Sequence, residues 1–293
     1  MALTVEEIRK DYGTGDYERD RNQTTPMEIQ RFDDIVYGTD PRWQVLDIYR
    51  PKKEDGKKLP VIVSVHGGAW VYGTKETYQY YGMSLAKRGF AVVNFTYRLA
   101  PENKFPSALE DTNLVFQWMK DNGEQYGLDL ERVFAVGDSA GAHLLTLFSN
   151  MCLNPEYAKH FSFSPVKEIH LQAVALNCGV YELNLKEDDD LMRILRQEVM
   201  PQGGTAEEEL LMNPLPFMTK QFPPVYVMTS NEDFLKDQAP LVVQRLEELE
   251  VPYRYHVYGD EHTLLYHVFH CNINLEAASQ CNDDECEFFK EYL

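Results

Sequence analysis

The chain has 293 residues, of which 44% are hydrophobic, and a formal net charge of −19 at pH 7. This composition indicates a globular protein with a large buried core. The acidic balance argues against nucleic acid or an anionic membrane surface as a partner, since both bind clusters of Lys and Arg. No apolar run approaches the roughly 18 residues that a membrane-spanning helix needs.

The N-terminal segment and the cysteines bear on the cell compartment. Residues 1–7 lack the basic start and the apolar stretch of a signal peptide. The five cysteines are odd in number and match no zinc spacing, so we expect free thiols, no bound metal and a cytoplasmic location. Secretion from a trimmed precursor is the alternative. The cysteines are Cys152, Cys178, Cys271, Cys281 and Cys286.

The first part of the chain predicts an appendage followed by two strands. Residues 1–30 are polar and charged, with helix-compatible pieces, and we expect them to lie over the core rather than to form a first strand. The apolar stretches 35–37 and 45–49 are separated by a turn and predict an antiparallel hairpin. We expect residues 31–293 to form one domain.

From residue 61 onward, predicted strands and helices alternate. The strands cover 61–65, 90–96, 132–136, 170–176, 224–229 and 253–258, with helices at 78–88, 107–122, 142–148, 239–250 and the C-terminus. This alternation predicts the α/β class, a mostly parallel central sheet with helices on both faces. The stretch at about 181–221 breaks the alternation. Ligands of such sheets bind beyond the carboxyl ends of the strands, so the residues that follow each strand are the informative ones.

Residues 137–141, Gly-Asp-Ser-Ala-Gly, lie between an apolar strand and a predicted helix. This context predicts a nucleophile elbow, a sharp strand-to-helix turn that exposes the hydroxyl of Ser139. Gly137 and Gly141 suit such a turn because side chains at these positions would clash with neighbouring backbone. A plain strand end is the alternative, so the remaining parts of a catalytic site decide between the two.

A glycine-containing loop, residues 66–70, follows the first strand of the alternation. The backbone N–H groups of Gly67 and Gly68 can hold an oxyanion, together with the N–H of Ala140. An ordinary glycine turn is the alternative. We expect His66 to brace this loop rather than to transfer protons.

An acid and a histidine follow the last two predicted strands. Asp233 and His262 give the chain order Ser, Asp, His that is expected for an α/β-hydrolase triad. Serine needs a base to remove its proton, histidine titrates near neutrality, and a carboxylate fixes the imidazole tautomer. Glu232 and Asp237 compete with Asp233 for the role of the acid.

Eight histidines compete for the role of the base, and we predict that His262 alone lies on a loop after a strand. We expect His143 to pack beneath the serine, and we place His267 and His270 in the C-terminal helical region. The other four lie in the glycine loop, within a strand or before a strand: His66, His256, His160 and His170.

Together these motifs resemble the hormone-sensitive-lipase-like family of α/β-hydrolase carboxylesterases. The matching stretches are 66–70, 97–102, 105–111, 137–141 and 233–237, and the resemblance spans the chain from about residue 35 onward. It implies an α/β-hydrolase fold with a small helical cap, formed here by residues 1–30 and an insertion at about 181–221. It also implies that Asp233 is the acid and that Gly67, Gly68 and Ala140 are the oxyanion donors.

Three residues depart from the family pattern. Phe234 stands where proline is common, Thr263 follows His262 where glycine is usual, and His143 occupies a place often held by asparagine. None of these departures removes a residue of the predicted triad.

We therefore expect a serine carboxylesterase that hydrolyses short-chain acyl esters through an acyl-enzyme, without a metal or organic cofactor. The short, charged insertion lacks a long apolar lid, which favours small soluble esters, with acetylated or feruloylated carbohydrates as candidates. An amidase, formamidase or peptidase with the same triad is one alternative, and a non-catalytic ligand-binding protein is another. Phe217, Met218 and Phe222 are candidates for the acyl pocket, with core packing as the alternative. The oligomeric state stays open, a homodimer being one option.

Overall fold

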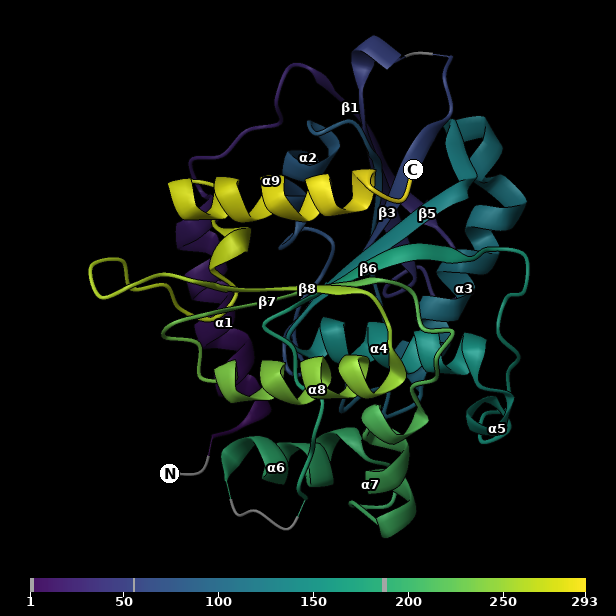
Figure 1. The fold of residues 1–293 in the computed structure, drawn as a ribbon, viewed down its shortest axis with the longest axis vertical. Coiled ribbons are helices and arrows are strands. Elements are labelled where there is room, and N and C mark those ends of the chain that lie inside the picture. The colour runs from purple at the N-terminus through teal and green to yellow at the C-terminus, as the bar shows by residue number, and fades with distance from the viewer. Residues whose placement is uncertain (1–2, 55, 186–188) are drawn as a thin grey trace.

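The computed structural model describes residues 3–54, 56–185 and 189–293 (Figure 1). Its strands form one eight-stranded sheet in the order β1-β2-β4-β3-β5-β6-β7-β8. Strand β2 is antiparallel to both of its neighbours, and the other pairs are parallel. The strands are β1 (Ile29–Val36), β2 (Val45–Pro51), β3 (Leu59–Val65), β4 (Ala91–Thr96), β5 (Leu128–Asp138), β6 (Leu171–Asn177), β7 (Val225–Ser230) and β8 (Tyr253–Tyr258).

Helices cover both faces of this sheet, which confirms the predicted α/β class. Figure 1 shows α2 and α9 on one side of the sheet and α4 and α8 on the other. The described helices are α1 (Val5–Asp20), α2 (Gln79–Ala86), α3 (Ser107–Asn122), α4 (Ala140–Leu153), α5 (Pro155–Ala158), α6 (Asp190–Ile194), α7 (Ala206–Met212), α8 (Ala239–Leu249) and α9 (Glu276–Lys290). None of the helices in the described ranges is long and apolar enough to cross a membrane.

The central strands are apolar throughout because both of their faces are covered. In β3, Val61, Val63 and Val65 join the core beneath α3, α4 and α8. The alternate residue Ile62 joins the second core beneath α2 and α9. All four side chains are at most 1% exposed. Such two-sided burial fixes the register of the strands, since a slip by one residue would exchange the two faces.

Two segments differ from the predicted layout. Strand β1 begins at Ile29, inside the stretch that we expected to be an appendage. The predicted C-terminal helix is confirmed as α9, but it begins only at Glu276. His267 therefore lies in the loop before α9, and His270 lies in a single 3-10 turn, Phe269–Cys271, rather than in the helix. A left-handed backbone at Val268, with φ 51° and ψ 33°, rules out a continuous helix through this stretch.

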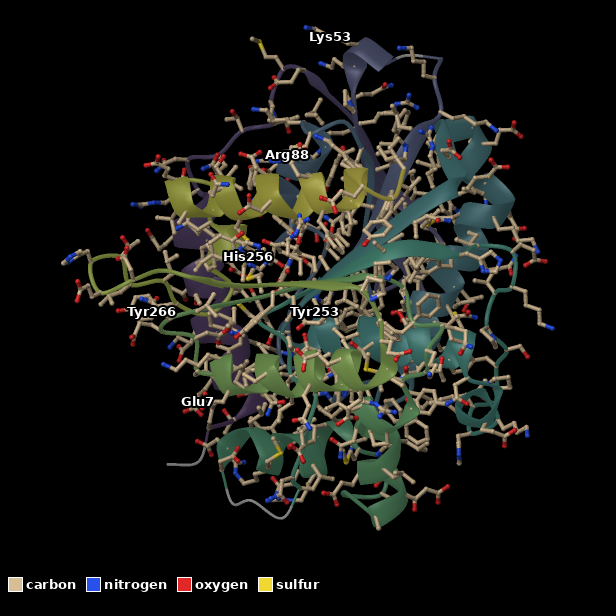
Figure 2. The ribbon with its side chains drawn as sticks, viewed as in Figure 1. Glu7, Lys53, Arg88, Tyr253, His256 and Tyr266 are labelled. Atoms are coloured by element: carbon tan, nitrogen blue, oxygen red, sulfur yellow. The ribbon has the colours of Figure 1, made fainter. Side chains whose placement is uncertain are left out.

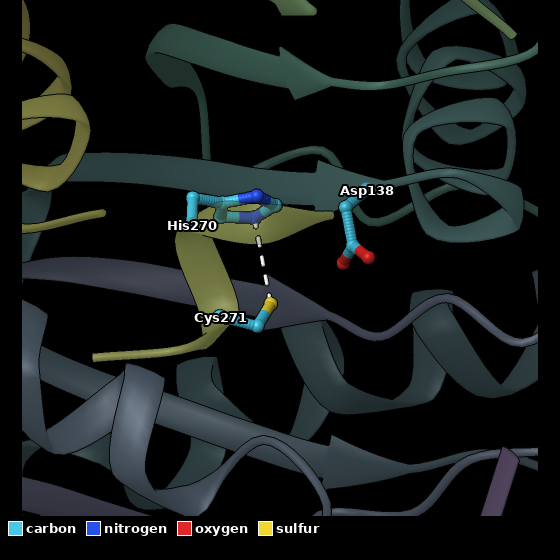
Figure 3. A group of neighbouring side chains, drawn as sticks. All are labelled: Asp138, His270 and Cys271. Carbon is cyan, nitrogen blue, oxygen red and sulfur yellow. Dashed lines mark hydrogen bonds between the residues drawn. The ribbon is translucent and has the colours of Figure 1, made fainter. Parts of the chain in front are cut away.

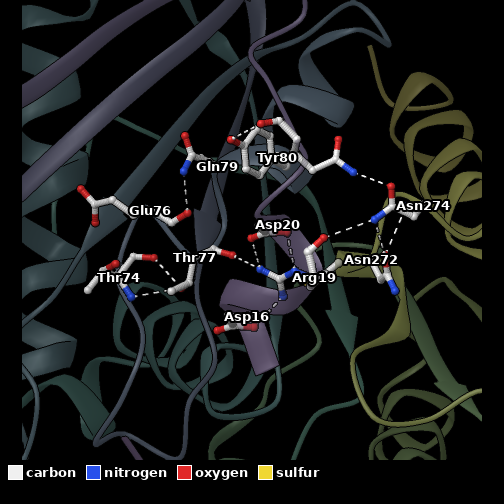
Figure 4. A network of polar contacts seen from close by, with 12 residues as sticks. Asp16, Arg19, Asp20, Thr74, Glu76, Thr77, Gln79, Tyr80, Asn272 and Asn274 are labelled. Carbon is white, nitrogen blue, oxygen red and sulfur yellow. Dashed lines mark hydrogen bonds and ion pairs between the residues drawn. The ribbon is translucent and has the colours of Figure 1, made fainter. Parts of the chain in front are cut away.

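Hydrogen bonds and ion pairs of two arginines attach helix α1 to the carboxyl edge of the sheet. The Arg9 side chain donates to the carbonyl oxygens of Val71 and Ala100 and pairs with Glu102 at 2.7 Å. Near the other end of the helix, Arg19 joins the network in Figure 4. These contacts attach α1 to segments that follow β3 and β4, at the carboxyl edge of the sheet. Residues 1–2 of the predicted N-terminal segment and residues 186–188 of the predicted insertion lie outside the described residues.

Hydrogen bonds join helix α9 to α2, to the residues just after α2, and to the end of β6. On its outer side, Arg88 donates to Asp283 at 2.8 Å and to the carbonyl oxygen of Ser279 (Figure 2). On its inner side, the buried Glu285 accepts hydrogen bonds from Tyr81 at 2.9 Å and from the side chain of Asn177 at 2.6 Å. The C-terminal helix thereby supports the end of β6, next to the candidate site.

Candidate active site

Ser139 lies at the turn between β5 and α4 with φ 52° and ψ −120°, a strained backbone conformation for a residue other than glycine. The clash expected at the flanking glycines is confirmed. A Cβ atom on Gly137 would lie 2.5 Å from the carbonyl oxygen of Gly141, and one on Gly141 would lie 2.0 Å from that of Val65. The turn therefore requires glycine at both positions, and it holds the serine at the N-terminus of α4.

Ser139 lines a cavity of about 640 Å³ at the carboxyl end of the sheet. Its walls come from the glycine loop after β3, from α1 and α6, and from the loops after β7 and β8. The lining includes Ile8, Tyr12, Trp70, Val180, Leu191 and Ile194. The wall of the cavity is thus mostly apolar, and the turn between β5 and α4 places Ser139 in it.

Asp233 and His267 form a hydrogen-bonded pair at this cavity. The carboxylate oxygen Oδ1 of Asp233 lies 2.7 Å from Nδ1 of His267. The Asp233 side chain is fully buried, and that of His267 is 20% exposed and lines the cavity with Ser139. Within the described part of the chain, Nε2 of His267 has no hydrogen-bond partner, so it is available to a group in the cavity.

The structure does not bring His262 to this pair, and the histidine assignment is corrected to His267. The side chain of His262 is 82% exposed, and its closest charged neighbour is the adjacent Glu261, at 3.4 Å. His262 lies on the turn after β8, whose ends are joined by a hydrogen bond from the Asp260 N–H to the carbonyl oxygen of Thr263. This turn points away from the cavity, since none of its residues lines it.

The chain after this turn folds back along β7 and delivers His267 to Asp233. The N–H of Glu232 donates to the carbonyl oxygen of Leu265, and the Ser230 hydroxyl donates to that of Tyr266. Glu232 and Tyr266 also form an isolated parallel bridge. The predicted histidine and the observed one thus lie five positions apart, and contacts with the end of β7 decide between them.

No sequence signal singles out His267. In the family pattern, glycine follows the histidine, but Thr263 follows His262 and Val268 follows His267. In the structure, Val268 adopts the left-handed conformation that glycine favours. This conformation is a property of the folded loop that the residue type did not indicate.

Several donors keep the Asp233 carboxylate ionised. Burial by itself would raise its pKa, but the hydrogen bond and the electrostatic interaction with the His267 imidazole, together with the other donors, outweigh burial and hold the pKa below its usual value. The Thr229 hydroxyl and the N–H of Leu235 donate to the two carboxylate oxygens at 3.0 and 2.8 Å. Phe234 packs its ring against the His267 imidazole, with ring centroids 4.4 Å apart. The pair is therefore fixed in both position and charge.

The glycine loop presents different N–H groups from those predicted. The N–H of Gly67 donates to the Tyr78 hydroxyl at 3.0 Å, so it is not available to a ligand, and this part of the prediction is corrected. The next two N–H groups, of Gly68 and Ala69, have no acceptor within the described residues. Both residues have positive φ, 116° and 51°. Ala140 begins α4, so its N–H has no partner inside the helix.

Two other histidines near the site are structural. His66 is buried, stacks on Tyr97 with centroids 4.0 Å apart and contacts the carbonyl oxygen of Gly67 through Nδ1, as the predicted bracing role requires. His143 is buried between Trp70 and the carbonyl oxygen of Met212. Burial lowers the pKa of each imidazole to about 4. Neither is positioned to act on Ser139.

The predicted acyl-pocket residues lie elsewhere. Met218 and Phe222 are 2% and 4% exposed and belong to the core. Phe217 packs against Tyr157 with ring centroids 4.4 Å apart. None of the three lines the cavity at Ser139, so the alternative of core packing is the correct one.

Two groups of side chains near Ser139 have the composition of metal ligands. One comprises Asp138, His270 and Cys271 (Figure 3), and the other Cys178, Asp233 and His267. In the first group, Asp138 accepts a hydrogen bond from Tyr78, and Cys271 contacts a ring nitrogen of His270. In the second group, Asp233 and His267 already bond to each other. We therefore assign neither group to a metal.

Comparison with known proteins places this geometry in a family. The BD-FAE family model matches residues 46–240, which is more than half of the chain. The chain belongs to the BD-FAE family of α/β-hydrolases, within the hormone-sensitive-lipase-like esterases, as the sequence motifs predicted. The matched range includes Ser139 and Asp233 and ends before His267.

Curated relatives are esterases by name. Esterase LipC of Mycobacterium tuberculosis is 28% identical over 72% of this chain and 54% of its own length. Esterase LipQ of the same organism is 30% identical over 68% of this chain and 48% of its own length. The arylesterase of Saccharolobus solfataricus is 29% identical, with 74% and 72% covered. The chain thus spans about half the length of the mycobacterial relatives.

Solved structures share the whole architecture. Inhibited esterase B from Lactobacillus rhamnosis superposes with a TM-score of 0.88 at 25% identity, covering 98% of this chain and 95% of its own. An esterase from Pyrobaculum calidifontis gives a TM-score of 0.78 at 24% identity, with 99% and 93% covered. The fold is therefore that of the α/β-hydrolases.

Proposed function

We propose that this protein is a serine carboxylesterase with Ser139 as nucleophile, His267 as general base and Asp233 as the acid that orients it. The observation that carries the proposal is the 2.7 Å bond between Asp233 and His267 at the cavity that Ser139 lines. A buried carboxylate bound to Nδ1 fixes the imidazole tautomer with Nε2 free to accept a proton. The strained turn at Ser139 keeps its hydroxyl exposed for attack.

The reaction follows from these positions. His267 removes the proton as Ser139 attacks the ester carbonyl, and the N–H groups of Gly68, Ala69 and Ala140 stabilise the negative oxygen of the tetrahedral intermediate. The protonated His267 then donates to the departing alcohol, which leaves an acyl-enzyme. Water, activated by the same histidine, releases the acid and restores the serine. Asp233 stays ionised throughout and stabilises the imidazolium.

We propose small acyl esters as substrates. The cavity of about 640 Å³ falls within the usual range for small-molecule sites, and α1 and α6 form the two sides that act as a cap. This size suits a short acyl chain, and acetyl or feruloyl esters of carbohydrates are candidate natural substrates. The names of the relatives, esterase LipC and an arylesterase among them, support an ester rather than an amide.

One experiment tests the proposal. The rates of hydrolysis of p-nitrophenyl esters, from acetate to laurate, are measured for the wild-type protein and for Ser139→Ala. We expect rates that fall toward laurate and a loss of about 10³-fold or more in Ser139→Ala, as is typical when a nucleophile is removed. Ser149→Ala is the matched control, because Ser149 lies buried in α4, the helix that follows Ser139, and its hydroxyl bonds, among the described residues, only to the carbonyl oxygen of Leu145.

A fluorophosphonate probe gives a second readout, since it should label the wild-type protein and not Ser139→Ala. Equal hydrolysis by both proteins would refute the mechanism. A rate maximum at the long esters would refute the substrate size.

A further inference from the structure

A chain of two buried hydrogen bonds joins the glycine loop to the nucleophile elbow. The N–H of Gly67 donates to the Tyr78 hydroxyl at 3.0 Å, and that hydroxyl donates to Oδ2 of Asp138 at 2.6 Å. Gly67 directly precedes the proposed donor Gly68, and Asp138 directly precedes Ser139. The phenol of Tyr78 therefore links the two halves of the site.

The glycine loop needs such a support because its backbone is strained. Gly68, Ala69 and Trp70 all have positive φ, at 116°, 51° and 61°. Two of these three residues carry side chains, and such conformations persist only where the surroundings hold them. A Cβ atom on Gly67 would lie 2.9 Å from Oδ2 of Asp138 and 3.1 Å from the Tyr78 hydroxyl. The loop thus packs tightly onto the pair that binds it.

The hydrogen-bonded pair of Tyr78 and Asp138 is poorly explained by its contribution to the stability of the fold alone. Asp138 is 2% exposed, and within the described residues its carboxylate accepts a side-chain hydrogen bond from Tyr78 only. Its other near neighbours are His270 and Cys271 (Figure 3), which burial keeps neutral. Burial raises the pKa of Asp138 to about 7. Among the described residues this buried acidic group has no bonded cation and one side-chain hydrogen bond, and burying such a polar group costs stability.

We infer that Tyr78 and Asp138 are positioning residues for the proposed esterase reaction: they hold Gly67 and thereby aim the N–H groups of Gly68 and Ala69 at the oxyanion. This inference rests on the proposed function and adds to it the device that orients the oxyanion donors. Both residues lie in the wall of the cavity, and in this inference they act by holding Gly67 rather than on the reacting atoms. Their effect belongs to the transition state, since the oxyanion forms only there.

The test separates a positioning role from a merely structural one. Tyr78→Phe removes one hydroxyl and leaves the ring. We expect kcat for p-nitrophenyl acetate to fall about 10- to 100-fold, less than the loss on deleting an oxyanion donor outright, while KM changes less than threefold. The inhibition constant of a trifluoromethyl ketone, which forms a tetrahedral adduct with the serine, should rise by the same factor as kcat falls.

Variants of Asp138 provide an independent test of the same positioning role. Asp138→Asn keeps an acceptor for the Tyr78 hydroxyl and should retain most of the activity, whereas Asp138→Ala should lose as much as Tyr78→Phe. The double variant Tyr78→Phe/Asp138→Ala should be no worse than either single variant, because both break the same chain. If Tyr78→Phe does not fold, the contrast between Asp138→Asn and Asp138→Ala carries the test.

Tyr157→Phe is the matched control. Tyr157 is fully buried, and its hydroxyl donates to the carbonyl oxygen of Leu211, away from the glycine loop. It should lower the melting temperature as Tyr78→Phe does and leave kcat unchanged. The inference is overturned if Tyr78→Phe, or Asp138→Ala in its place, keeps kcat and the inhibition constant within twofold while Ser139→Ala is inactive. If Ser139→Ala is itself active, the proposed function has failed instead.

Discussion

At the scale of single residues, two backbone conformations prepare the chemistry. Ser139, which belongs to the proposed triad, has a positive φ, and so does Val268, which directly follows the proposed triad residue His267. A β-branched residue such as Val268 is seldom found there, and the strain is tolerated because the loop is bonded to β7 on its N-terminal side. The left-handed conformation at Val268 prevents a helix from continuing through His267, and the imidazole is thereby oriented toward Asp233.

Replacing each of the two histidines of the loop, His262 and His267, by glutamine tests the assignment of His267 as the base. We expect His267→Gln to reduce kcat/KM for p-nitrophenyl acetate by about 10³-fold or more, because no other histidine of the described residues lines the cavity with Ser139. His262→Gln should stay within about twofold of wild type, since its side chain is 82% exposed and remote from the cavity. Circular dichroism checks that both variants are folded. Loss of activity in His262→Gln alone would restore the original assignment.

At the scale of elements, α1 is held in place by polar contacts as well as by the buried side chain of Ile8. The guanidinium of Arg19 pairs with Asp16 and Asp20 on its own helix and donates to the carbonyl oxygen of Thr77 in the segment before α2 (Figure 4). Arg19 and Asp16 also line the cavity, so the contact that anchors the helix is also a wall of the site. The position of α1 should therefore affect substrate binding more than the chemical step.

Arg19→Met tests this role of α1. Methionine keeps the apolar stem but loses the hydrogen bonds, which leaves two half-buried carboxylates without their cation. We expect KM to rise several-fold with a smaller change in kcat, and amide hydrogen exchange over residues 5–20 to become faster. Arg21→Met is the control, because Arg21 pairs with Glu18 on the exposed side of the helix and should change neither quantity. Equal KM values for both variants would contradict this account.

At the scale of the whole molecule, a buried carboxylate makes stability depend on pH. Burial raises the pKa of Glu285 to about 7, against the hydrogen bonds from Asn177 and Tyr81. The native state therefore keeps a proton on Glu285 at pH values where the unfolded chain, with a pKa of about 4.5, has released it. Between these two values the free energy of unfolding falls as the pH rises, and the loss is complete above about pH 7.

Glu285→Gln should remove the part of this loss that comes from Glu285, whereas the part from Asp138, whose pKa burial also raises to about 7, should remain. The full pKa difference corresponds to a free energy on the order of 3 kcal/mol, and glutamine cannot ionise. Its amide can donate to the buried Oδ1 of Asn177, which has no partner among the described residues, once the Asn177 amide turns over. Urea unfolding at several pH values between about 5 and 8 measures the effect. The exposed Glu287→Gln on the same helix is the control, and equal pH profiles for the two variants would contradict the prediction.

The sequence by itself determined the features that depend on residues close together in the chain. The alternating strands and helices follow from local apolar patterns, and α3 runs over the predicted residues 107–122. The elbow at Ser139 requires two glycines within five residues, and Asp233 lies directly after its strand. Steric and packing requirements between neighbouring residues explain these features, so the rest of the fold was not needed to predict them.

Only the tertiary structure decided which histidine meets Asp233 and which N–H groups face the cavity. His262 and His267 follow the same strand, and they are told apart by bonds between the returning loop and β7. Gly67 and Ala69 are told apart by the hydroxyl of Tyr78, which takes one N–H and leaves the other. These are contacts between segments that the sequence separates, and a single sequence does not specify the closure of a loop around a distant side chain.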